Sequence, residues 1–127
     1  MAANDLTVIF NQLKKLLAPY AKQMEVRNNT ATDYHLYIAH EIILAGRKLP
    51  ECYFCGLKMN KRMVSLHFFP VYTHPAEIHV PAIVQPLLKS KSCFNYITLN
   101  DALLQGTQEL LEEGAAVYRK HGVLKMK

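Results

Sequence analysis

The side chains most able to do chemistry lie between Tyr53 and Phe94, in the middle of the chain. Ser65 and His67 are two positions apart in an alternating segment, so they would share one face of a β-strand. Phe68 and Phe69 directly follow His67. A polar pair on a strand with aromatic neighbours predicts a face that a ligand can enter, and the alternative is a buried pair whose polar atoms bond to the backbone.

A second group of polar side chains follows in the segment Lys89–Asn95, which reads Lys-Ser-Lys-Ser-Cys-Phe-Asn. Two ammonium groups, the Ser92 hydroxyl and backbone N–H groups at a turn are donors that can bind an anion. The segment lacks the glycines of a phosphate-binding loop. The pattern therefore favours an anion-binding turn or, as the alternative, a basic turn on the surface.

The thiol of Cys93 lies close in sequence to Lys89 and Lys91. Positive charge favours the thiolate, which would make Cys93 a nucleophile or a sensor of oxidants. His67 is the candidate base for this chemistry. The alternative for Cys93 is a small buried apolar residue at the start of a strand.

The pair Cys52 and Cys55 has the spacing of a redox motif or of two zinc ligands. A redox pair precedes a helix, however, whereas this pair opens a strand pattern. On a regular strand an offset of three places two side chains on opposite faces. We therefore expect cysteines of the core or of a strand end.

Two further groups of side chains have the chemistry of metal ligands. His67, His74 and His79 are near one another in sequence but lack a standard ligand spacing, so we expect surface or lining histidines. The acidic residues form one close group, Glu109, Glu112 and Glu113. On a helix they would face solvent, and a hard cation needs more converging carboxylates than these.

The elements that must position these groups follow from hydrophobic periodicity. Alternating patterns predict strands over Met24–Asn28, Tyr34–Ala39, Tyr53–Met59, Arg62–Phe69 and Cys93–Ile97, with a hairpin turn at Asn60–Lys61. Helical patterns cover a first segment from Asn4 or Asp5 to about Pro19, a short segment Pro81–Leu88 that Pro86 interrupts, and a last segment from about Asn100 to Lys120. The segment Ile42–Leu44 fits either a strand continuation or a loop. Together these patterns predict an α+β fold with a single antiparallel sheet of about five strands, covered by N- and C-terminal helices.

Length and composition predict one domain over residues 1–127, with 50% hydrophobic and 20% charged residues. No apolar run is long enough to cross a bilayer, the first residues do not resemble a secretory signal, and the chain has three cysteines. We therefore expect a cytoplasmic protein without a membrane partner. The net charge of +5 comes from basic residues spread along the chain, which is typical of a solvated basic surface and leaves nucleic acid as an open alternative.

The stretch Tyr53–Tyr72, followed by Lys91–Asn95, resembles the YdhG-like family (domain-of-unknown-function family 1801). The shared elements are a Phe-x-Gly strand, Lys61 in the turn, a Val-Ser-x-His-x-x-Pro-x-Tyr segment and a Lys-Ser-Cys-Phe run. The resemblance implies a small α+β domain of frataxin-like architecture, and most members have no assigned activity. One bacterial branch is regarded as a frataxin-like iron chaperone.

The sequence thus predicts a non-enzymatic binding or accessory domain that takes a small anionic ligand or a protein partner, as a monomer or a homodimer. The candidate ligand-binding residues are Lys61, Ser65, His67, Tyr72, Lys91, Ser92 and Cys93. No cofactor is expected. The first alternative is frataxin-like iron binding through the Glu109 group, and the second is thiol-dependent activity at Cys93.

Overall fold

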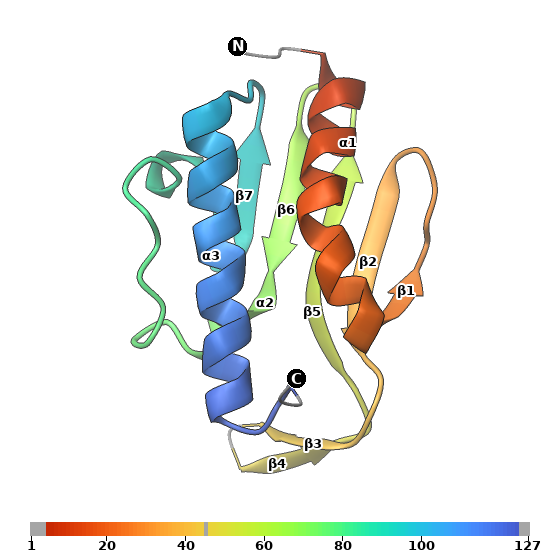
Figure 1. Ribbon diagram of the computed structural model, residues 1–127, viewed down its shortest axis with the longest axis vertical. Helices are drawn as coiled ribbons and strands as arrows, with labels where there is room; N and C mark the ends of the chain where they lie inside the picture. Colours follow the sequence, from red (N-terminus) through yellow and green to blue (C-terminus); the bar gives the residue numbers. More distant parts are fainter. Residues whose placement is uncertain (1–4, 45, 125–127) are drawn as a thin grey trace.

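The computed structural model describes residues 5–44 and 46–124, and these residues form an α+β fold (Figure 1). The helices are α1 (Leu6–Leu17), α2 (Phe69–Thr73) and α3 (Asp101–Lys120), with 3₁₀ turns η1 (Ala18–Gln23) and η2 (Gln85–Leu87). The strands are β1 (Glu25–Arg27), β2 (Asp33–Ile38), β3 (Ile42–Leu44), β4 (Arg47–Leu49), β5 (Cys52–Met59), β6 (Val64–Phe68) and β7 (Cys93–Tyr96). The predicted fold class is confirmed.

Five of these strands form one antiparallel sheet in the order β1-β2-β5-β6-β7. The predicted hairpin joins β5 to β6, and the Asn60 side chain accepts hydrogen bonds from the backbone N–H groups of Arg62 and Met63 within the turn. The segment that the sequence left open, Ile42–Leu44, is neither a continuation of β2 nor a loop. It pairs with Arg47–Leu49 in a separate two-stranded ribbon at the lower end of the molecule (Figure 1).

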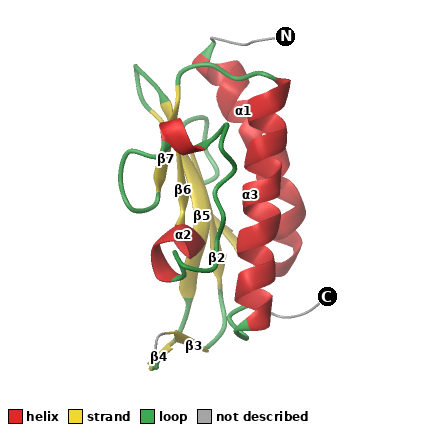
Figure 2. Ribbon diagram, turned by 90° about the vertical axis from the view of Figure 1, so that its left-hand side faces the viewer, coloured by secondary structure: helices red, strands yellow, loops and turns green. Residues whose placement is uncertain are grey.

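Both long helices lie on the same face of the sheet, so the fold has two layers (Figure 2). The Asp5 carboxylate caps α1 by accepting the N–H of Thr7 at 2.9 Å, and the Asn100 side chain caps α3 by accepting the N–H of Leu103 at 2.8 Å. The apolar stripe of α1 is buried at Ile9, Phe10, Leu13 and Leu17. No described helix has the length and apolar character that a membrane crossing requires.

The core between sheet and helices centres on Phe54, which is fully buried. Its ring contacts Tyr20 from the first helical segment, Phe68 from β6 and Tyr118 from α3, with ring centroids 5.5–5.9 Å apart. A buried hydrogen bond of 2.7 Å joins the hydroxyls of Tyr96 and Thr107. Burial raises the pKa of Tyr96, so its hydroxyl stays protonated inside the core.

The expectation that Cys52 and Cys55 point to opposite faces is wrong. Cys52 lies opposite Ile38 and Cys55 opposite Leu36, and both of these partners are buried on the helix side. The register between β2 and β5 shifts at this point, and the extra residue in β5 returns both thiols to one face. Burial raises the pKa of Cys52 to about 11 and that of Cys55 well above its usual value, which makes both thiols core groups, as the sequence predicts.

The chain between α2 and β7 contains less helix than its sequence predicts. Only Gln85–Leu87 is helical, as one 3₁₀ turn that follows a turn in which the N–H of Val84 donates to the carbonyl of Pro81. Pro86 has no N–H to donate and its ring obstructs the preceding turn, so a regular α-helix cannot form here. This segment leads back to β7 at the sheet edge.

Candidate ligand-binding face

The face of the sheet opposite α1 and α3 is the candidate site, because neither of these long helices covers it (Figure 2). The short helix α2 borders it through Phe69. The register places polar side chains in rows that run across the strands. One row is His35, Gly56, His67 and Cys93, and the next is Asp33, Lys58, Ser65 and Asn95. We call this surface the open face. Its polar groups contrast with the apolar residues that alternate with them along the same strands.

Gly56 occupies the centre of the first row, between His35 and His67. The missing side chain lets His35 and Tyr53 meet above the strand, where His35 Nδ1 and the Tyr53 hydroxyl form a hydrogen bond of 3.0 Å. A Cβ atom at position 56 would overlap both of these atoms. Glycine is therefore required for this contact by space, and a larger residue would push the two side chains apart.

Aromatic rings form a continuous series across the lower half of the open face. Tyr37 contacts Tyr53 with ring centroids 5.1 Å apart, Tyr53 contacts Phe69 at 6.4 Å, and Phe69 contacts Tyr72 at 5.6 Å. A cation lies at each end of the series. The Arg27 guanidinium is 4.0 Å from the Tyr37 ring centre, and Lys91 Nζ is 5.7 Å from that of Tyr72.

A shallow cleft of about 300 Å³ lies over this aromatic series. The residues that line it come from β2, β5, β6, the start of α2 and the two adjoining loops: Asn28, His35, Tyr37, Tyr53, His67, Phe69 and Ser92. Flat apolar surfaces and a few polar atoms are the usual composition of a small-molecule site. Burial raises the pKa of Tyr53, so its hydroxyl remains a neutral hydrogen-bonding group at the cleft.

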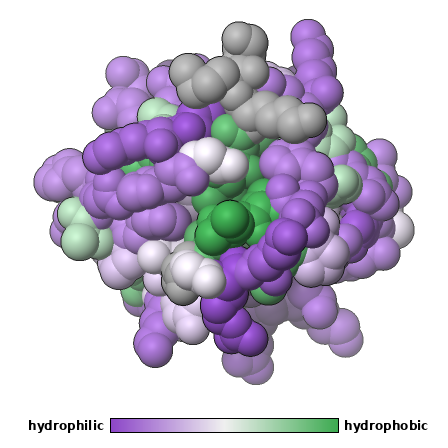
Figure 3. Space-filling model, turned by 90° about the horizontal axis from the view of Figure 1, so that it is seen from below, coloured by the Kyte–Doolittle hydropathy of each residue, from purple (hydrophilic) through white to green (hydrophobic). Residues whose placement is uncertain are grey.

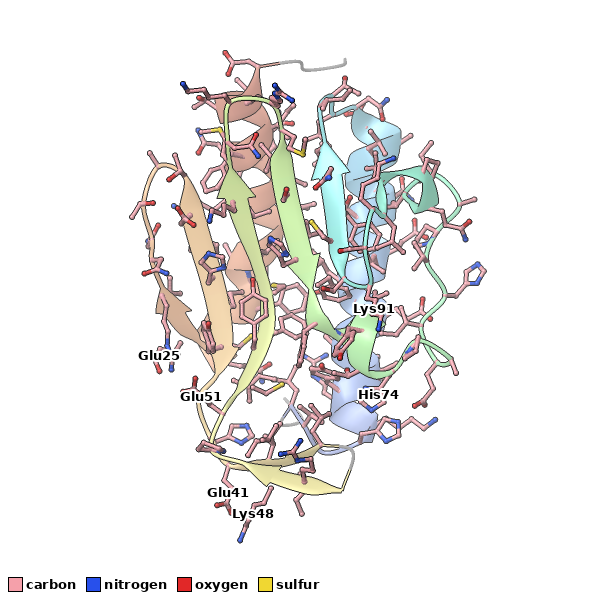
Figure 4. All side chains as sticks on the ribbon, turned by 180° about the vertical axis from the view of Figure 1, so that it is seen from behind. Glu25, Glu41, Lys48, Glu51, His74 and Lys91 are labelled. Atoms are coloured by element: carbon pink, nitrogen blue, oxygen red, sulfur yellow. The ribbon has the colours of Figure 1, made fainter. Side chains whose placement is uncertain are left out.

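The two cations that end the aromatic series differ in their ion pairing. Arg27 donates two hydrogen bonds to the Glu51 carboxylate, at 2.7 and 2.9 Å, and two to the Glu25 carboxylate, at 3.1 and 3.2 Å, so its charge is neutralised. In the described part of the chain, no carboxylate lies within ion-pair distance of Lys91. Figure 4 looks onto the open face and shows Glu25 and Glu51 on one side of its lower half and Lys91 on the other. Among the described residues, the cation of this series without a carboxylate partner is therefore Lys91, on the side of the open face away from Glu25 and Glu51.

A second polar group lies on the β7 side of the open face. The Ser65 hydroxyl donates to Asn95 Oδ1 at 2.8 Å, and the Cys93 thiol donates to the same oxygen at 3.3 Å. His67 and Cys93 are direct cross-strand partners. The flanking bond from the N–H of Phe68 to the carbonyl of Ser92 makes them a narrow pair, the kind in which side chains approach most closely.

The pKa of His67 is lowered by its burial and, to a smaller extent, by the nearby charges of His35 and Lys58. The imidazole is therefore neutral near pH 7, and one of its ring nitrogens can accept a proton. A neutral imidazole beside the thiol of Cys93 has the form that a general base requires.

The structure brings most of the predicted ligand-binding residues to one region. Ser65, His67 and Cys93 lie on the open face, Ser92 lines the cleft, and Tyr72 and Lys91 lie together at its edge. Lys61 is the exception. It lies in the β5–β6 turn, beyond Val64, which is itself about 10 Å along β6 from His67 at the usual rise per residue.

The sequence reasoning missed the part of the cleft that β2 and β5 supply, namely His35, Tyr37, Tyr53 and Gly56. The alternation of β2 already places His35 and Tyr37 on one side of their strand. What the sequence does not contain is the order and register of the strands, which sets these residues beside His67. Applying the polar-face criterion to every predicted strand could have found them.

The predicted metal candidates, Glu109, Glu112 and Glu113, do not form a group of three converging ligand atoms in the described part of the chain. Glu113 accepts the backbone N–H of His79 at 2.7 Å, and Glu112 accepts a hydrogen bond from Gln108, while Glu109 is exposed on α3. Within residues 5–44 and 46–124, one group of three side chains brings ligand atoms within 4.8 Å of one another, and it is His74, Glu77 and His121. It contains none of these three glutamates and neither His67 nor His79.

Comparisons of the chain with family models, with curated proteins and with solved structures found no match. The resemblance to the YdhG-like family stays a prediction. Function must therefore be inferred from the site.

Proposed function

We propose that this protein is a non-enzymatic cytoplasmic binding domain whose open face holds a small, flat, anionic molecule. The observation that carries the proposal is the series of aromatic rings from Tyr37 to Tyr72, which ends at Lys91, a cation with no carboxylate of residues 5–44 and 46–124 within ion-pair distance. The rings would contact the flat part of the ligand, and Lys91 would bind its carboxylate or phosphate. Membership of the YdhG-like family belongs to the same proposal.

The polar atoms at the cleft support this assignment. The Ser92 side chain lines it beside Lys91, and the residue belongs to the turn for which the sequence predicts anion binding. His35 and Tyr53 hold each other in place through their hydrogen bond, so their positions are set before a ligand arrives. Groups that are already ordered lose less entropy on binding.

The experiment compares flat anions with their neutral counterparts. We expect benzoate or adenosine monophosphate to raise the melting temperature, because a ligand of the folded state stabilises it by mass action, and benzamide and adenosine to raise it less. Lys91→Ala should weaken the anion by about tenfold or more, since a hydrogen bond to a charged group contributes about 1.5–3 kcal/mol. Calorimetry supplies the affinities.

Lys61→Ala is the matched control, because it removes an exposed lysine from the far end of β6. It should leave the affinity unchanged. Two results would reject the proposal: no anion shifts the melting temperature, or the two lysine variants weaken binding equally.

Thiol chemistry at Cys93 is the second candidate function, favoured by the narrow His67–Cys93 pair. With iodoacetamide, His67 would accept the thiol proton, sulfur would bond to the methylene carbon, and iodide would leave. We expect Cys93 to react first, with Cys52 and Cys55 protected by burial, and His67→Ala to slow Cys93 about tenfold. An unchanged rate in His67→Ala would exclude His67 as the base.

A further inference from the structure

Three side chains with metal-binding chemistry meet below the open face, where α2 and α3 end. His74 is the C-cap residue that follows α2, and Glu77 lies in the loop after it. His121 is the C-cap residue that follows α3. One ligand atom from each lies within 4.8 Å of the other two. Figure 4 shows His74 below Lys91, at the end of α2. The group is separate from the residues that line the cleft.

The backbone holds all three residues at this position. The N–H of His74 donates to the carbonyl of Pro70 at 2.9 Å, and the N–H of Glu77 donates to the carbonyl of His74 at 3.1 Å. The N–H of His121 donates to the carbonyl of Val117 at 3.1 Å, which fixes it to the last turn of α3. A site built on ordered backbone needs only side-chain rotation to bind an ion.

The partner of His74 orients its imidazole as a metal ligand. His74 Nδ1 is 2.9 Å from Thr73 Oγ1, which also lies 2.8 Å from the Tyr118 hydroxyl and 3.4 Å from the carbonyl of Phe69. In the tautomer whose Nδ1–H donates to Thr73, Nε2 keeps its lone pair, and such a hydrogen bond is the usual support of a metal-bound histidine.

The other two side chains, Glu77 and His121, are already joined by a hydrogen bond. Glu77 Oε2 and His121 Nε2 are 2.6 Å apart, while Glu77 Oε1 bonds to Lys120 at 3.1 Å. The His74 and His121 rings stack with centroids 4.6 Å apart. A metal ion bound to all three ligand atoms would set them about 3.3 Å from one another, the spacing given by bonds of about 2.0–2.1 Å. Glu77 Oε2 and His121 Nε2 would therefore move apart from 2.6 Å to make room for the ion.

We propose that His74, Glu77 and His121 bind a divalent transition-metal ion such as Zn²⁺. Two imidazoles and one carboxylate suit zinc and its neighbours and do not suit Mg²⁺ or Ca²⁺, which prefer oxygen ligands. The side chains of Glu77 and His121 are 32% and 38% exposed, so an ion can enter from solvent and keep a position for water. The rival account is an ion pair between Glu77 and protonated His121, without a metal.

Calorimetric titration of the untagged full chain with Zn²⁺ distinguishes the two accounts. We expect one ion per chain, no heat with Mg²⁺, and a loss of affinity of about tenfold or more in His121→Ala and in His74→Ala. His79→Ala is the matched control, because His79 is exposed two residues after Glu77 and bonds Glu113 through its backbone N–H. It should bind as the parent does.

A second measurement reports on metal coordination itself, which a purely structural role of the histidines would not affect. In a tetrahedral site Co²⁺ gives intense visible absorption, which should appear with the parent and with His79→Ala and be absent with His121→Ala. Melting temperatures without metal show whether each variant remains folded. No Zn²⁺ binding, or equal binding by the His121 and His79 variants, would overturn the proposal.

Discussion

The two faces of the main sheet differ in the side chains that they carry. On the covered face, Leu36, Leu57 and Leu66 are fully buried. On the open face, the residues next to them in sequence are polar, and Gly56 lacks a side chain. The same strands therefore supply most of the core on one side and carry the proposed binding site on the other. A substitution should cost stability on one face and affinity on the other.

Adjacent phenylalanines give the sharpest test of this difference. Phe68 is fully buried on the covered face, whereas Phe69 lies at the cleft. Phe68→Ala should lower the free energy of unfolding by about 3–5 kcal/mol, because it leaves a cavity in the core. Phe69→Ala should cost about 1–2 kcal/mol, since it loses ring contacts at a half-buried position. Urea unfolding measures both, and equal costs would contradict the division between the faces.

Two glycines provide the next test. A Cβ at Gly114 on α3 would overlap the ring of the buried Phe68. Gly114→Ala should therefore destabilise by about 1–3 kcal/mol, although alanine is the better helix former by about 1 kcal/mol. Gly56→Ala meets only His35 and Tyr53, which can rotate into the open cleft, so stability should change by less than about 1 kcal/mol. Binding of the anion should nevertheless weaken, and a stabilised Gly114→Ala would show that α3 packs differently.

Hydroxyl groups distinguish the faces by a smaller amount. Thr107→Val leaves the buried Tyr96 hydroxyl without its partner and should cost about 1–2 kcal/mol. Ser65→Ala removes a partly exposed hydrogen bond to Asn95, where water can replace the hydroxyl, and should cost about 0.5 kcal/mol. Thermal and urea unfolding of the two variants give the comparison. A larger cost for Ser65→Ala would mean that the open face is the more rigid one.

The smallest expected effect is a pH dependence at His67. Its folded-state pKa lies below the ordinary value of 6.5, so the unfolded chain binds more protons between these two values. Stability should therefore fall as the pH falls through about 6.5 towards the folded-state value. In His67→Asn this part of the loss should disappear, as seen in unfolding free energies at about pH 8 and about pH 5. An identical pH profile in the variant would assign the dependence to other groups, of which His74 is one.

The sequence was sufficient for the long helices and the five strands of the main sheet, because periodicity alone separates the apolar faces of α1, β6 and α3 from their polar faces. It did not predict α2 or the β3–β4 ribbon. The sequence was not sufficient where one extra residue in a strand changes the face to which the neighbouring side chains point. The bulge in β5 reverses the expected position of Cys52 relative to Cys55, and its one local sign in the sequence is Gly56, a glycine inside the strand pattern directly after Cys55. Pro86 is the opposite case, because its effect on the segment Pro81–Leu88 could be anticipated and only its extent was underestimated.

Only the part of the candidate site that β6 and β7 supply was predictable from the sequence. Ser65, His67 and Cys93 lie in segments whose polar residues stand out locally. The contribution of β2 depends on strand order, and the group of His74, Glu77 and His121 joins residues more than forty positions apart in sequence. Such distant pairs are set by the packing of α3 against α2, which periodicity does not describe.

The edges of the sheet have a consequence for self-association. An edge strand with free N–H and C=O groups is a template for pairing with another chain. Here β1 is three residues long and charged at Glu25 and Arg27, and at the other edge the N–H of Lys89 donates to the carbonyl of Cys93 at 2.9 Å. Both edges are thus poor templates for strand addition. The protein can leave a whole sheet face uncovered at high concentration without inviting aggregation through the backbone.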